Sequence, residues 1–335
     1  MRSWKNSKPL VSVVCTTYNH ALYVDDAIRG FLIQKTDFPF EIVVHDDVST
    51  DNTRLIVERY AAEYPNIIKT VFQQQNQYSQ GKMILVLASE YASGDFIAFC
   101  EGDDYWIDST KLQNQVDALK RYPESEVCFH AAIKTVQEQP QKLLFCRRAE
   151  GEKIMDVRAV IKEGGSFMPT ASMLIRRSFF DKITREDTTF YQRHLDAYFF
   201  QIFSSLSAGA VYVDKPMSVY RSFSQGSWTE MIFKDSAFYI NWLSNHIVRL
   251  HEADEITQHV YSEDFNFAIK RSHLSALNNK GLDLTFRKNY YQRYRNELGS
   301  LGFFLWHFIF KFPAVHALFL RGRDVIDNKI KQRPI

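Results

Sequence analysis

Apolar runs alternate with segments of helical spacing along the first 135 residues of the chain. The runs are short and rich in Val and Ile, as in strands that are buried on both faces. They lie at 10–17, 40–47, 67–72 and 95–102, and the helical segments between them at 22–34, 51–64 and 82–92. Strands that alternate with helices form a mostly parallel central sheet with helices on both faces. The pattern therefore predicts a Rossmann-like α/β fold.

Beyond residue 109 strands continue to alternate with helices, and from about residue 230 only helices are expected. The expected elements are a helix at 109–121, strands at 127–132, within 166–178 and at 210–214, and a helix at 194–207. Between 136 and 165 the sequence is a charged, Gln-rich connection, and from about residue 230 it has helical spacing throughout. We predict one domain over 1–229, divided into halves at about residue 135, and a helical C-terminal region over 230–335.

Charge and cysteine content narrow the class of protein. Lys and Arg total 41 against 39 for Asp and Glu, and the formal charge of +2 predicts no general attraction for nucleic acid. The four cysteines stand singly, without a CxxC pair, as expected of reduced core thiols in a cytosolic protein. Residues 1–8 are polar and lack the apolar core of a signal peptide. We expect a cytoplasmic protein.

Polar residues stand where three of the predicted strands end. They are Thr17 and Asn19 after the first strand, Asp46 and Asp47 after the second, and Glu101, Asp103 and Asp104 after the fourth. Because the carboxyl ends of parallel strands meet at one edge of a sheet, where ligands bind, we expect these side chains to lie close together. A carboxylate at any one of these places could instead cap the helix that follows.

The sequence Glu101-Gly102-Asp103-Asp104 sets three acids within four residues. Such acids repel one another unless a cation or hydrogen-bond donors neutralise them. Mg²⁺ or Mn²⁺ suits oxygen ligands and keeps coordination positions open for the oxygens of a diphosphate. No GxxxxGK[ST] loop and no GxGxxG turn follows the first strand, so a nucleotide would be held through the metal. A metal that stabilises a departing nucleoside diphosphate makes sugar transfer the predicted chemistry.

Four separated segments resemble the family 2 glycosyltransferases, which have the GT-A fold, over about residues 9–230. VSVVCTTYNH at 11–20 resembles the family's opening strand and donor-binding turn, and EIVVHDDVSTDNT at 41–53 resembles its acidic turn. FIAFCEGDDYW at 96–106 resembles the family's form of the DxD motif. MSVYRSFSQGSW at 217–228 resembles a segment that reads close to YRxHxxGxWS. The resemblance implies a nucleotide-binding half, an acceptor half and a metal-dependent transfer of a sugar from a nucleotide-sugar donor.

The resemblance also implies a role for each matching residue. Thr17 and Tyr18 would line the nucleoside pocket, and Asp46 or Asp47 would contact the base. Further candidates for binding the nucleotide sugar are Asn19, Lys82, Glu101, Asp103 and Arg221.

The metal and the general base are implied in the same way. Asp104 would be the direct metal ligand, with Asp103 near the ribose, the diphosphate and the metal. Asp196, in a helix start beyond the acceptor loop, would be the general base, which implies direct displacement with inversion. Asp196 as a helix N-cap is the alternative, and it stays open.

Two positions depart from the family pattern. Phe223 stands where the family segment commonly has a histidine that helps to bind metal or diphosphate. Either the metal would rely on Asp104, phosphate oxygens and water, or Arg221 and nearby hydroxyl groups would take over some phosphate contacts. His194 stands where a small or acidic residue is more usual, and either a structural role or a contact with the acceptor would explain it.

The stretch at 301–320 has the length of a membrane span but contains His307, Lys311, Pro313 and His316, which make spanning costly. Basic residues follow it, at Arg321, Arg323, Lys329, Lys331 and Arg333. A helix lying on the cytoplasmic face of the inner membrane would explain both features. A helix packed on the catalytic domain or in a homodimer is the alternative.

The leading hypothesis is an inverting glycosyltransferase that acts in surface polysaccharide synthesis. Its donor would be a nucleotide sugar, with a UDP-sugar favoured, and its acceptor a saccharide or a lipid-linked saccharide. Two alternatives remain open. One is a nucleotidyltransferase of related fold, against which the lack of a glycine-rich basic loop argues. The other is a catalytically weak homologue that acts as a binding or assembly subunit, as Phe223 would suit.

Overall fold

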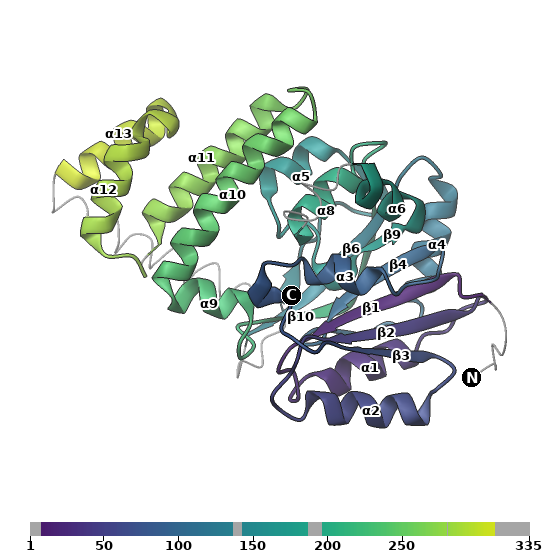
Figure 1. The fold of residues 1–335 in the computed structure, drawn as a ribbon. Coiled ribbons are helices and arrows are strands. Elements are labelled where there is room, and N and C mark those ends of the chain that lie inside the picture. The colour runs from purple at the N-terminus through teal and green to yellow at the C-terminus, as the bar shows by residue number, and fades with distance from the viewer. Residues whose placement is uncertain (1–7, 137–142, 187–195, 280, 312–335) are drawn as a thin grey trace. The chain divides into compact units, whose positions relative to one another are not determined.

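The computed structural model describes residues 8–136, 143–186, 196–279 and 281–311. The chain divides into two compact units, Met1–Ser224 and Gln225–Ile335 (Figure 1). Each unit encloses hydrophobic clusters of its own.

A sheet of mostly parallel strands forms the centre of the first unit. Its strands are β1 (Val11–Thr17), β2 (Phe40–Asp46), β3 (Ile68–Phe72), β4 (Phe96–Glu101), β5 (Tyr105–Trp106), β6 (Val127–Val136), β7 (Leu143–Phe145), β8 (Lys153–Met155), β9 (Leu174–Arg176) and β10 (Ala210–Ser222). Their order is β3-β2-β1-β4-β9-β6-β10-β5, with β7 beside β6 and β8 beside β10. Strands β1 to β4 pair in parallel, as do β6 and β10, whereas β9 lies antiparallel between β4 and β6. The predicted α/β fold is confirmed.

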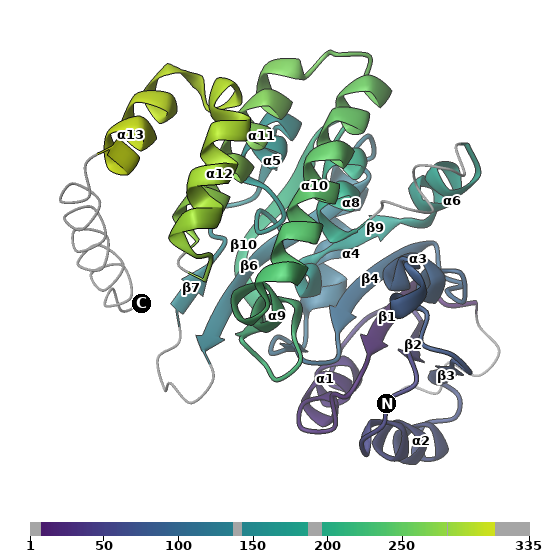
Figure 2. The same cartoon turned by 60° about the vertical axis from the view of Figure 1, so that its left-hand side comes forward.

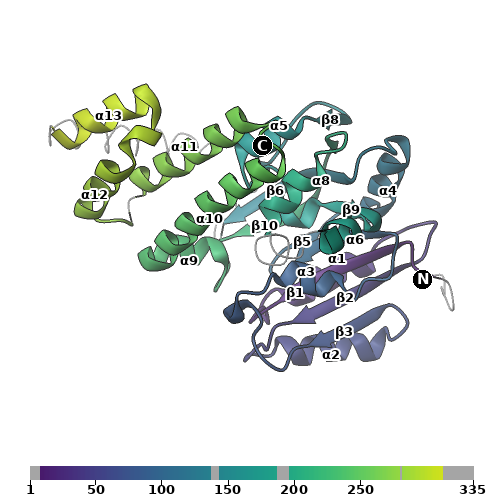
Figure 3. The same ribbon diagram turned by 45° about the horizontal axis from the view of Figure 1, so that its top comes forward.

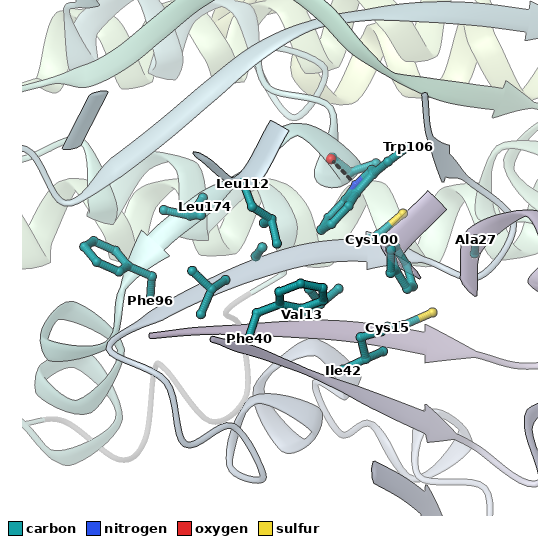
Figure 4. Close-up of a cluster of buried hydrophobic side chains, with 14 of the residues drawn as sticks. Val13, Cys15, Ala27, Phe40, Ile42, Phe96, Cys100, Trp106, Leu112 and Leu174 are labelled. Atoms are coloured by element: carbon teal, nitrogen blue, oxygen red, sulfur yellow. Dashed lines mark hydrogen bonds between the residues drawn. The ribbon is translucent and has the colours of Figure 1, made fainter. Parts of the chain in front are cut away.

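Helices cover both faces of this sheet (Figures 1 and 2). They are α1 (Val24–Leu32), α2 (Thr53–Glu63), α3 (Ile84–Ser89), α4 (Lys111–Arg121), α5 (Val157–Glu163), α6 (Arg177–Glu186) and α8 (Ala197–Ser204), with 3-10 turns η1 (Tyr78–Gln80) and η2 (Thr170–Ser172). Val13 and Cys15 of β1 share one core with α1, α2 and α4. Figure 4 shows them with Ala27 of α1 and Leu112 of α4. From the other face, Phe200 of α8 contacts Phe99 of β4, with ring centroids 5.7 Å apart. The central strands are therefore buried on both faces, which explains their continuous apolar sequences.

The largest difference from the predicted elements lies in β10. We expected a strand at 210–214 and a separate segment after it, but Ala210–Ser222 form one strand. Its pairing with β6 shifts register between Val213 and Ser218. Pro216 falls in this irregularity, where its missing N–H removes no ladder bond. The irregularity could not be predicted from the sequence, because only the pairing with β6 shows that these residues form a bulge within one strand.

Other predicted elements differ in length. The third helix is confined to Ile84–Ser89, and β6 continues to Val136. The connection at 136–165, for which no element was predicted, contributes β7, β8 and α5 within the described residues. Three of the four thiols, those of Cys15, Cys100 and Cys128, are buried and free, and the fourth, Cys146, is half-buried and free.

A buried polar cluster around Trp106 holds the strand-end turn of β4 in place. The indole Nε1 donates to the carbonyl oxygen of Ala171 (2.9 Å), as Figure 4 shows, and the ring meets Phe31 of α1 edge-on. A Cβ on Gly30 would lie 2.7 Å from the Trp106 carbonyl oxygen, so α1 can approach this closely only with glycine there. Lys111, which is fully buried, places its Nζ 3.9 Å from the centroid of the same indole.

Replacing Lys111 by Met should change how stability depends on pH. Burial lowers the pKa of Lys111 from 10.5 to about 7, and its Nζ donates to Gln115 Oε1 (2.6 Å) without a carboxylate partner among the described residues. Between those pH values the unfolded chain binds the proton and the folded chain does not, so wild-type stability gains up to about 1.4 kcal/mol per pH unit as pH rises. The variant lacks this gain. Urea unfolding at pH 7, 8 and 9 measures the difference.

The matched control is Lys120→Met on the same helix, whose side chain is 57% exposed. Its unfolding free energy should follow that of the wild type at each pH. If the profile of Lys111→Met also ran parallel to that of the wild type, the pKa of Lys111 would not be lowered.

The second unit is helical over its described residues. Its helices are α9 (Trp228–Lys234), α10 (Ser236–Ile256), α11 (Ser262–Asn278), α12 (Leu284–Tyr294) and α13 (Gly299–Lys311), with the turn η3 (Arg295–Glu297). Helices α10 and α11 lie side by side (Figure 3). The prediction of helix from about residue 230 is confirmed for the residues described.

The described part of the 301–320 stretch is α13. Trp306 and Ile309 are buried in a cluster with Leu277, Tyr291 and Leu298 of the same unit. None of the helices among the described residues is both long and apolar enough to cross a membrane. Pro313, His316 and the basic residues that follow lie outside the described residues. Membrane contact and a homodimer through these helices stay predictions.

Candidate functional site

The acid cluster lies in the turn that follows β4. Glu101 ends the strand, and the Asp104 N–H donates to the Glu101 carbonyl oxygen (3.0 Å), which closes the turn. A Cβ on Gly102 would lie 2.6 Å from Thr17 Cγ2, so the turns after β1 and β4 can pack this closely only around a glycine. The two strand ends are thereby held together, as predicted from their positions.

Asp104 is a buried carboxylate with an incomplete set of partners. Its side chain is 1% exposed, and its Oδ1 accepts a hydrogen bond from the backbone N–H of Arg221 (2.8 Å). Its Oδ2 is buried without a hydrogen-bond partner among the described residues. Burial, and then the charges of Asp103 and Glu101, raise the pKa of Asp104 well above its usual range. Burial and the charge of Asp103 likewise raise the pKa of Glu101 to about 7.

A divalent cation fits this cluster. Three neighbouring acids, one with an unpartnered buried oxygen, have the charge and the hard oxygen atoms that Mg²⁺ or Mn²⁺ prefers. No group of three or more Asp, Glu, His or Cys side chains encloses an ion site within the described residues. Asp103 is half-buried and Asp104 almost fully buried, so Asp103 is the more accessible of the two proposed ligands.

Arg221 joins the end of β10 to the acid cluster. Its Nη1 donates to the carbonyl oxygen of Asp103 (2.8 Å), and its guanidinium forms an ion pair with Asp26 of α1. It also lies 4.3 Å from the ring centroid of Tyr105. Ser224, three residues later, donates to Asp103 Oδ2 (2.5 Å). Arg221, a predicted donor-binding residue, thus contacts the acid cluster, although it lies more than a hundred residues away from the acids in the sequence.

Phe223 lies between these two contacts, where the resemblance implies a histidine. Its φ is 65°, in the left-handed region that costs a bulky residue about 1–3 kcal/mol. Arg221 before it and Ser224 after it both bond Asp103, so the chain is held on either side of Phe223.

The loops after β1 and β2 are joined by side-chain hydrogen bonds. Asn19 Oδ1 accepts from Thr50 N (2.8 Å), and Asn19 N donates to Ser49 Oγ (2.8 Å). Asp51 Oδ2 accepts from Ala21 N (3.0 Å). The motif residues therefore hold two loops in register at the carboxyl edge of the sheet. Contact of Asn19 with the donor stays a prediction.

Asp46 and Asp47 are almost fully buried and bonded within the protein. Asp46 accepts from Thr17 Oγ1 (3.0 Å) and from Ser49 N (3.0 Å). Asp47 accepts from the backbone N–H groups of Gln77 (2.7 Å) and Tyr78 (3.0 Å), which anchors η1. Both carboxylates thus position loops, and neither is singled out as the residue that would contact a base.

Tyr18 and Lys82 are exposed at the same edge of the sheet. Tyr18 follows β1 and is 47% exposed. Lys82 follows η1, and its backbone N–H donates to Gln77 O (3.1 Å), so it belongs to the loop that Asp47 anchors. Their proposed contacts with the nucleotide sugar stay predictions.

Asp196 begins α8 as its N-cap. Its Oδ1 accepts from the backbone N–H groups of Tyr198 (3.0 Å) and Phe199 (3.2 Å). Asp196 is therefore the N-cap of α8, as the alternative proposed. This role is compatible with a general base, because a cap uses the carboxylate as a hydrogen-bond acceptor and does not protonate it. His194 lies outside the described residues.

Two residues of this region were not assigned from the sequence. His20 packs on Gly102, where a Cβ would lie 2.9 Å from its Nδ1, and it stands in the same motif as Asn19. Burial lowers the pKa of His20 although Asp103, Asp51 and Asp46 favour the proton. Thr170 of η2 bonds Glu101. No sequence signal marks Thr170, because only the return of β9 beside β4 brings η2 to the acids.

Part of this chain is similar to curated proteins. An uncharacterized protein of Mycobacterium tuberculosis is 32% identical over 218 residues, which cover 65% of this chain and 60% of that protein. The Escherichia coli UDP-Glc:alpha-D-GlcNAc-diphosphoundecaprenol beta-1,3-glucosyltransferase WfgD is 31% identical over 143 residues, covering 41% of this chain and 53% of its own length. The chain thus spans about half to three fifths of the length of these relatives.

Among solved structures, the mannosyltransferase PcManGT of Pyrobaculum calidifontis, in complex with GDP-Man and Mn²⁺, has a TM-score of 0.57 at 18% identity. The match covers 96% of this chain and 81% of that chain, and it shows the shared fold. The model of the family described as Glycosyl transferase family 2 matches residues 12–184, more than half of the sequence and including the whole acid cluster. The chain belongs to glycosyl transferase family 2.

Proposed function

We propose that this protein transfers a sugar from a nucleotide-sugar donor to a hydroxyl group of a saccharide or lipid-linked acceptor, with inversion, in the synthesis of a surface polysaccharide such as a capsule, an O-antigen or an exopolysaccharide. The observation that carries the proposal is the acid cluster bonded to Arg221 at the carboxyl edge of a family 2 domain. The name of the Escherichia coli relative, which describes a sugar donor with a nucleotide and an acceptor on a diphospholipid, supports it.

In the proposed reaction the acid cluster and Arg221 bind the diphosphate of the donor. A bound Mg²⁺ or Mn²⁺ would supply positive charge to the diphosphate as it departs. Asp103 and Asp104 are the residues to hold that ion. Arg221 lies beside them with a guanidinium that can bind phosphate oxygens, if its pairing with the exposed Asp26 is exchanged for them.

Asp196 is the proposed general base. Its carboxylate removes the proton of the acceptor hydroxyl while that oxygen bonds to the anomeric carbon and the bond from this carbon to the diphosphate breaks. A single displacement of this kind inverts the configuration. Asp196 stands at the N-terminus of α8, where the helix dipole favours a negatively charged side chain.

We also propose a class of donor and a cellular location. A UDP-sugar is favoured by the Escherichia coli relative, whereas GDP-Man in the archaeal neighbour keeps the base undecided. We propose action in the cytoplasm, with peripheral contact at the inner membrane through the C-terminal helices, since a lipid-linked acceptor would be found there.

A panel of nucleotide sugars tests the function. UDP-, GDP- and dTDP-sugars are incubated with the purified protein in Mn²⁺, in Mg²⁺ and in EDTA, and release of nucleoside diphosphate is measured. We expect release from one donor class, dependent on metal. Release of pyrophosphate from a nucleoside triphosphate and a sugar phosphate would instead identify a nucleotidyltransferase. If the protein shows no turnover of any donor and no metal-dependent nucleotide binding, it is an assembly subunit, which is the alternative that Phe223 favours.

A further inference from the structure

The antiparallel strand β9 brings the turn that precedes it, η2, to the carboxyl edge of the sheet. Because β9 runs against β4, with Ala98 opposite Leu174, the residues before β9 follow β4 towards its carboxyl end. The backbone continues this course, since Phe99 N donates to the carbonyl oxygen of Met173 (3.1 Å). The 3-10 turn η2 therefore lies beside the end of β4, at the edge where ligands bind in sheets of this kind.

Two residues of η2 bond the two ends of the segment that carries the acids. We call residues 101–104 the acid turn. The side chain of Thr170 bonds the carboxyl group of Glu101, where this turn begins. The carbonyl oxygen of Ala171 accepts from Trp106 Nε1 (2.9 Å), two residues beyond its end. The place of η2 therefore influences where both proposed metal ligands lie.

Gln115 of α4 holds the third residue of η2. Its Nε2 donates to the carbonyl oxygens of Ser172 (2.7 Å) and Cys128 (3.2 Å), and its Oε1 accepts from Lys111 Nζ (2.6 Å). Gln115 and these three partners are fully buried. Two carbonyl groups at one end of the amide and a donor at the other permit a single orientation of the side chain. Gln115 thus fixes η2 against α4 and β6.

A continuous chain of buried contacts consequently runs from α4 to the acids. Removal of the Gln115 amide would leave the carbonyl oxygen of Ser172 without this donor, inside a core where no water replaces it. Relaxation of η2 would then move the groups that hold Glu101 and Trp106. Side chains that orient the ligands of a metal without touching the metal contribute about 10- to 100-fold to its affinity.

We propose that Gln115 is a positioning residue for the metal: through η2 it sets the place of the acid turn. The inference rests on the proposed function, which gives that turn a divalent ion to hold. Gln115 contacts none of the three acids, and it acts through Ser172 and its neighbours in η2. Thr170 is the last link of the chain, because it is the η2 side chain that bonds an acid.

Binding of Mn²⁺ to the full chain tests this. Mn²⁺ is titrated with saturating UDP, GDP or dTDP, whichever the wild type binds, and the free ion is measured by electron paramagnetic resonance. Gln115→Met, which keeps the length of the side chain but removes its polar atoms, should weaken Mn²⁺ binding about 10-fold. It should also broaden the spectrum of the bound ion, since acids that are less firmly placed give a range of ligand geometries.

The matched control is Gln34→Met. Gln34 is a second buried glutamine, and its amide bonds Gly30 O (3.2 Å), Asp108 O (2.7 Å) and Leu112 N (3.1 Å), none of which belongs to η2 or the acid turn. Urea unfolding should show a comparable loss of stability in both variants, whereas Gln34→Met should keep the Mn²⁺ affinity of the wild type. An equal loss of Mn²⁺ affinity in the two variants would show that general loosening of the core is responsible, and the inference would be wrong.

A second pair of variants tests the contact with the acids and decides the matter if Gln115→Met does not fold. Thr170→Val keeps the shape of the side chain but removes its hydroxyl group, and it should weaken Mn²⁺ binding about 10-fold. Thr170→Ser keeps the hydroxyl group and should bind Mn²⁺ nearly as the wild type does.

The outcomes separate this inference from the function on which it rests. If the wild type binds no Mn²⁺ with any of the three nucleoside diphosphates, both are wrong. If the wild type binds Mn²⁺ and the folded variants Gln115→Met and Thr170→Val bind it equally well, the inference alone is wrong, and the acid turn keeps its place without η2.

Discussion

Replacing Asp196 by Asn is expected to lower sugar transfer about 10²- to 10⁴-fold, the usual contribution of a general base. The substitution separates the two roles that Asp196 has been given. Asn is as good an N-cap as Asp, so its side-chain oxygen can still accept from Tyr198 N and Phe199 N, and the free energy of unfolding should change by less than about 0.5 kcal/mol. An amide has no basicity at neutral pH, so the acceptor hydroxyl keeps its proton. Transfer rates under saturating donor, together with urea unfolding, measure both effects.

Two further variants separate the loss of the N-cap from the loss of the general base. Asp196→Ala should lose about 1 kcal/mol of stability in addition to activity, because it removes the cap as well. Asp156→Asn changes another N-cap aspartate, at α5, whose carboxylate accepts from Arg158 N (2.8 Å), and it should leave transfer unchanged. Full transfer activity in Asp196→Asn would show that Asp196 is a cap alone.

Asp103→Asn should produce the second large effect, a loss of about 10²- to 10³-fold in transfer, comparable with the removal of one group that stabilises transition-state charge. Asp103 is more accessible than Asp104, and its Oδ2 accepts a hydrogen bond from Ser224. The amide can still accept that hydrogen bond but supplies no charge to a cation. We therefore expect Mn²⁺ to bind more weakly, and nucleoside diphosphate binding to lose its dependence on Mn²⁺.

Electron paramagnetic resonance of Mn²⁺, with and without nucleoside diphosphate, measures this directly. Asp104→Asn should also lose metal-dependent binding while it keeps an acceptor for Arg221 N. If Asp104→Asn bound as the wild type does, Asp104 would be a residue that positions β10 and no metal ligand. Asp117→Asn, at a 40% exposed position of α4, is the control for the loss of a carboxylate. Unchanged Mn²⁺ binding in both Asp103→Asn and Asp104→Asn would place the metal elsewhere.

Local patterns in the sequence were enough to predict most of the sheet. The runs that became β1, β2 and β4 are apolar without alternation because α1, α2 and α4 bury one face and α3 and α8 the other. The ends of these strands could be predicted because a strand buried on both faces excludes polar residues, so the first polar residues mark where it ends. The same reasoning placed the acids near Thr17, and parallel pairing of β1 with β4, Thr16 opposite Glu101, brings them there.

Contacts made across long stretches of sequence could not be predicted in this way. The bulge in β10 depends on the register of β6, and the contact of Thr170 with Glu101 depends on β9, which enters the sheet against the direction of its neighbours. Asp47 looks in the sequence like an acid at a ligand site, but it is bonded to η1, thirty residues later. A carboxylate at a strand end is compatible with both fates until its partners are known.

The sequence by itself determined the class of fold, the family and the acid cluster, since periodicity, strand composition and a run of acids are properties of neighbouring residues. Only the tertiary structure decided which polar groups are already satisfied and which are not. It bonded Asp46, Asp47 and Asn19 within the protein, connected Arg221 to the acids, and left Asp104 Oδ2 and His20 Nδ1 without hydrogen-bond partners among the described residues. The physical reason is that satisfaction of a buried polar group depends on donors and acceptors from other strands and loops, and their approach is set by packing.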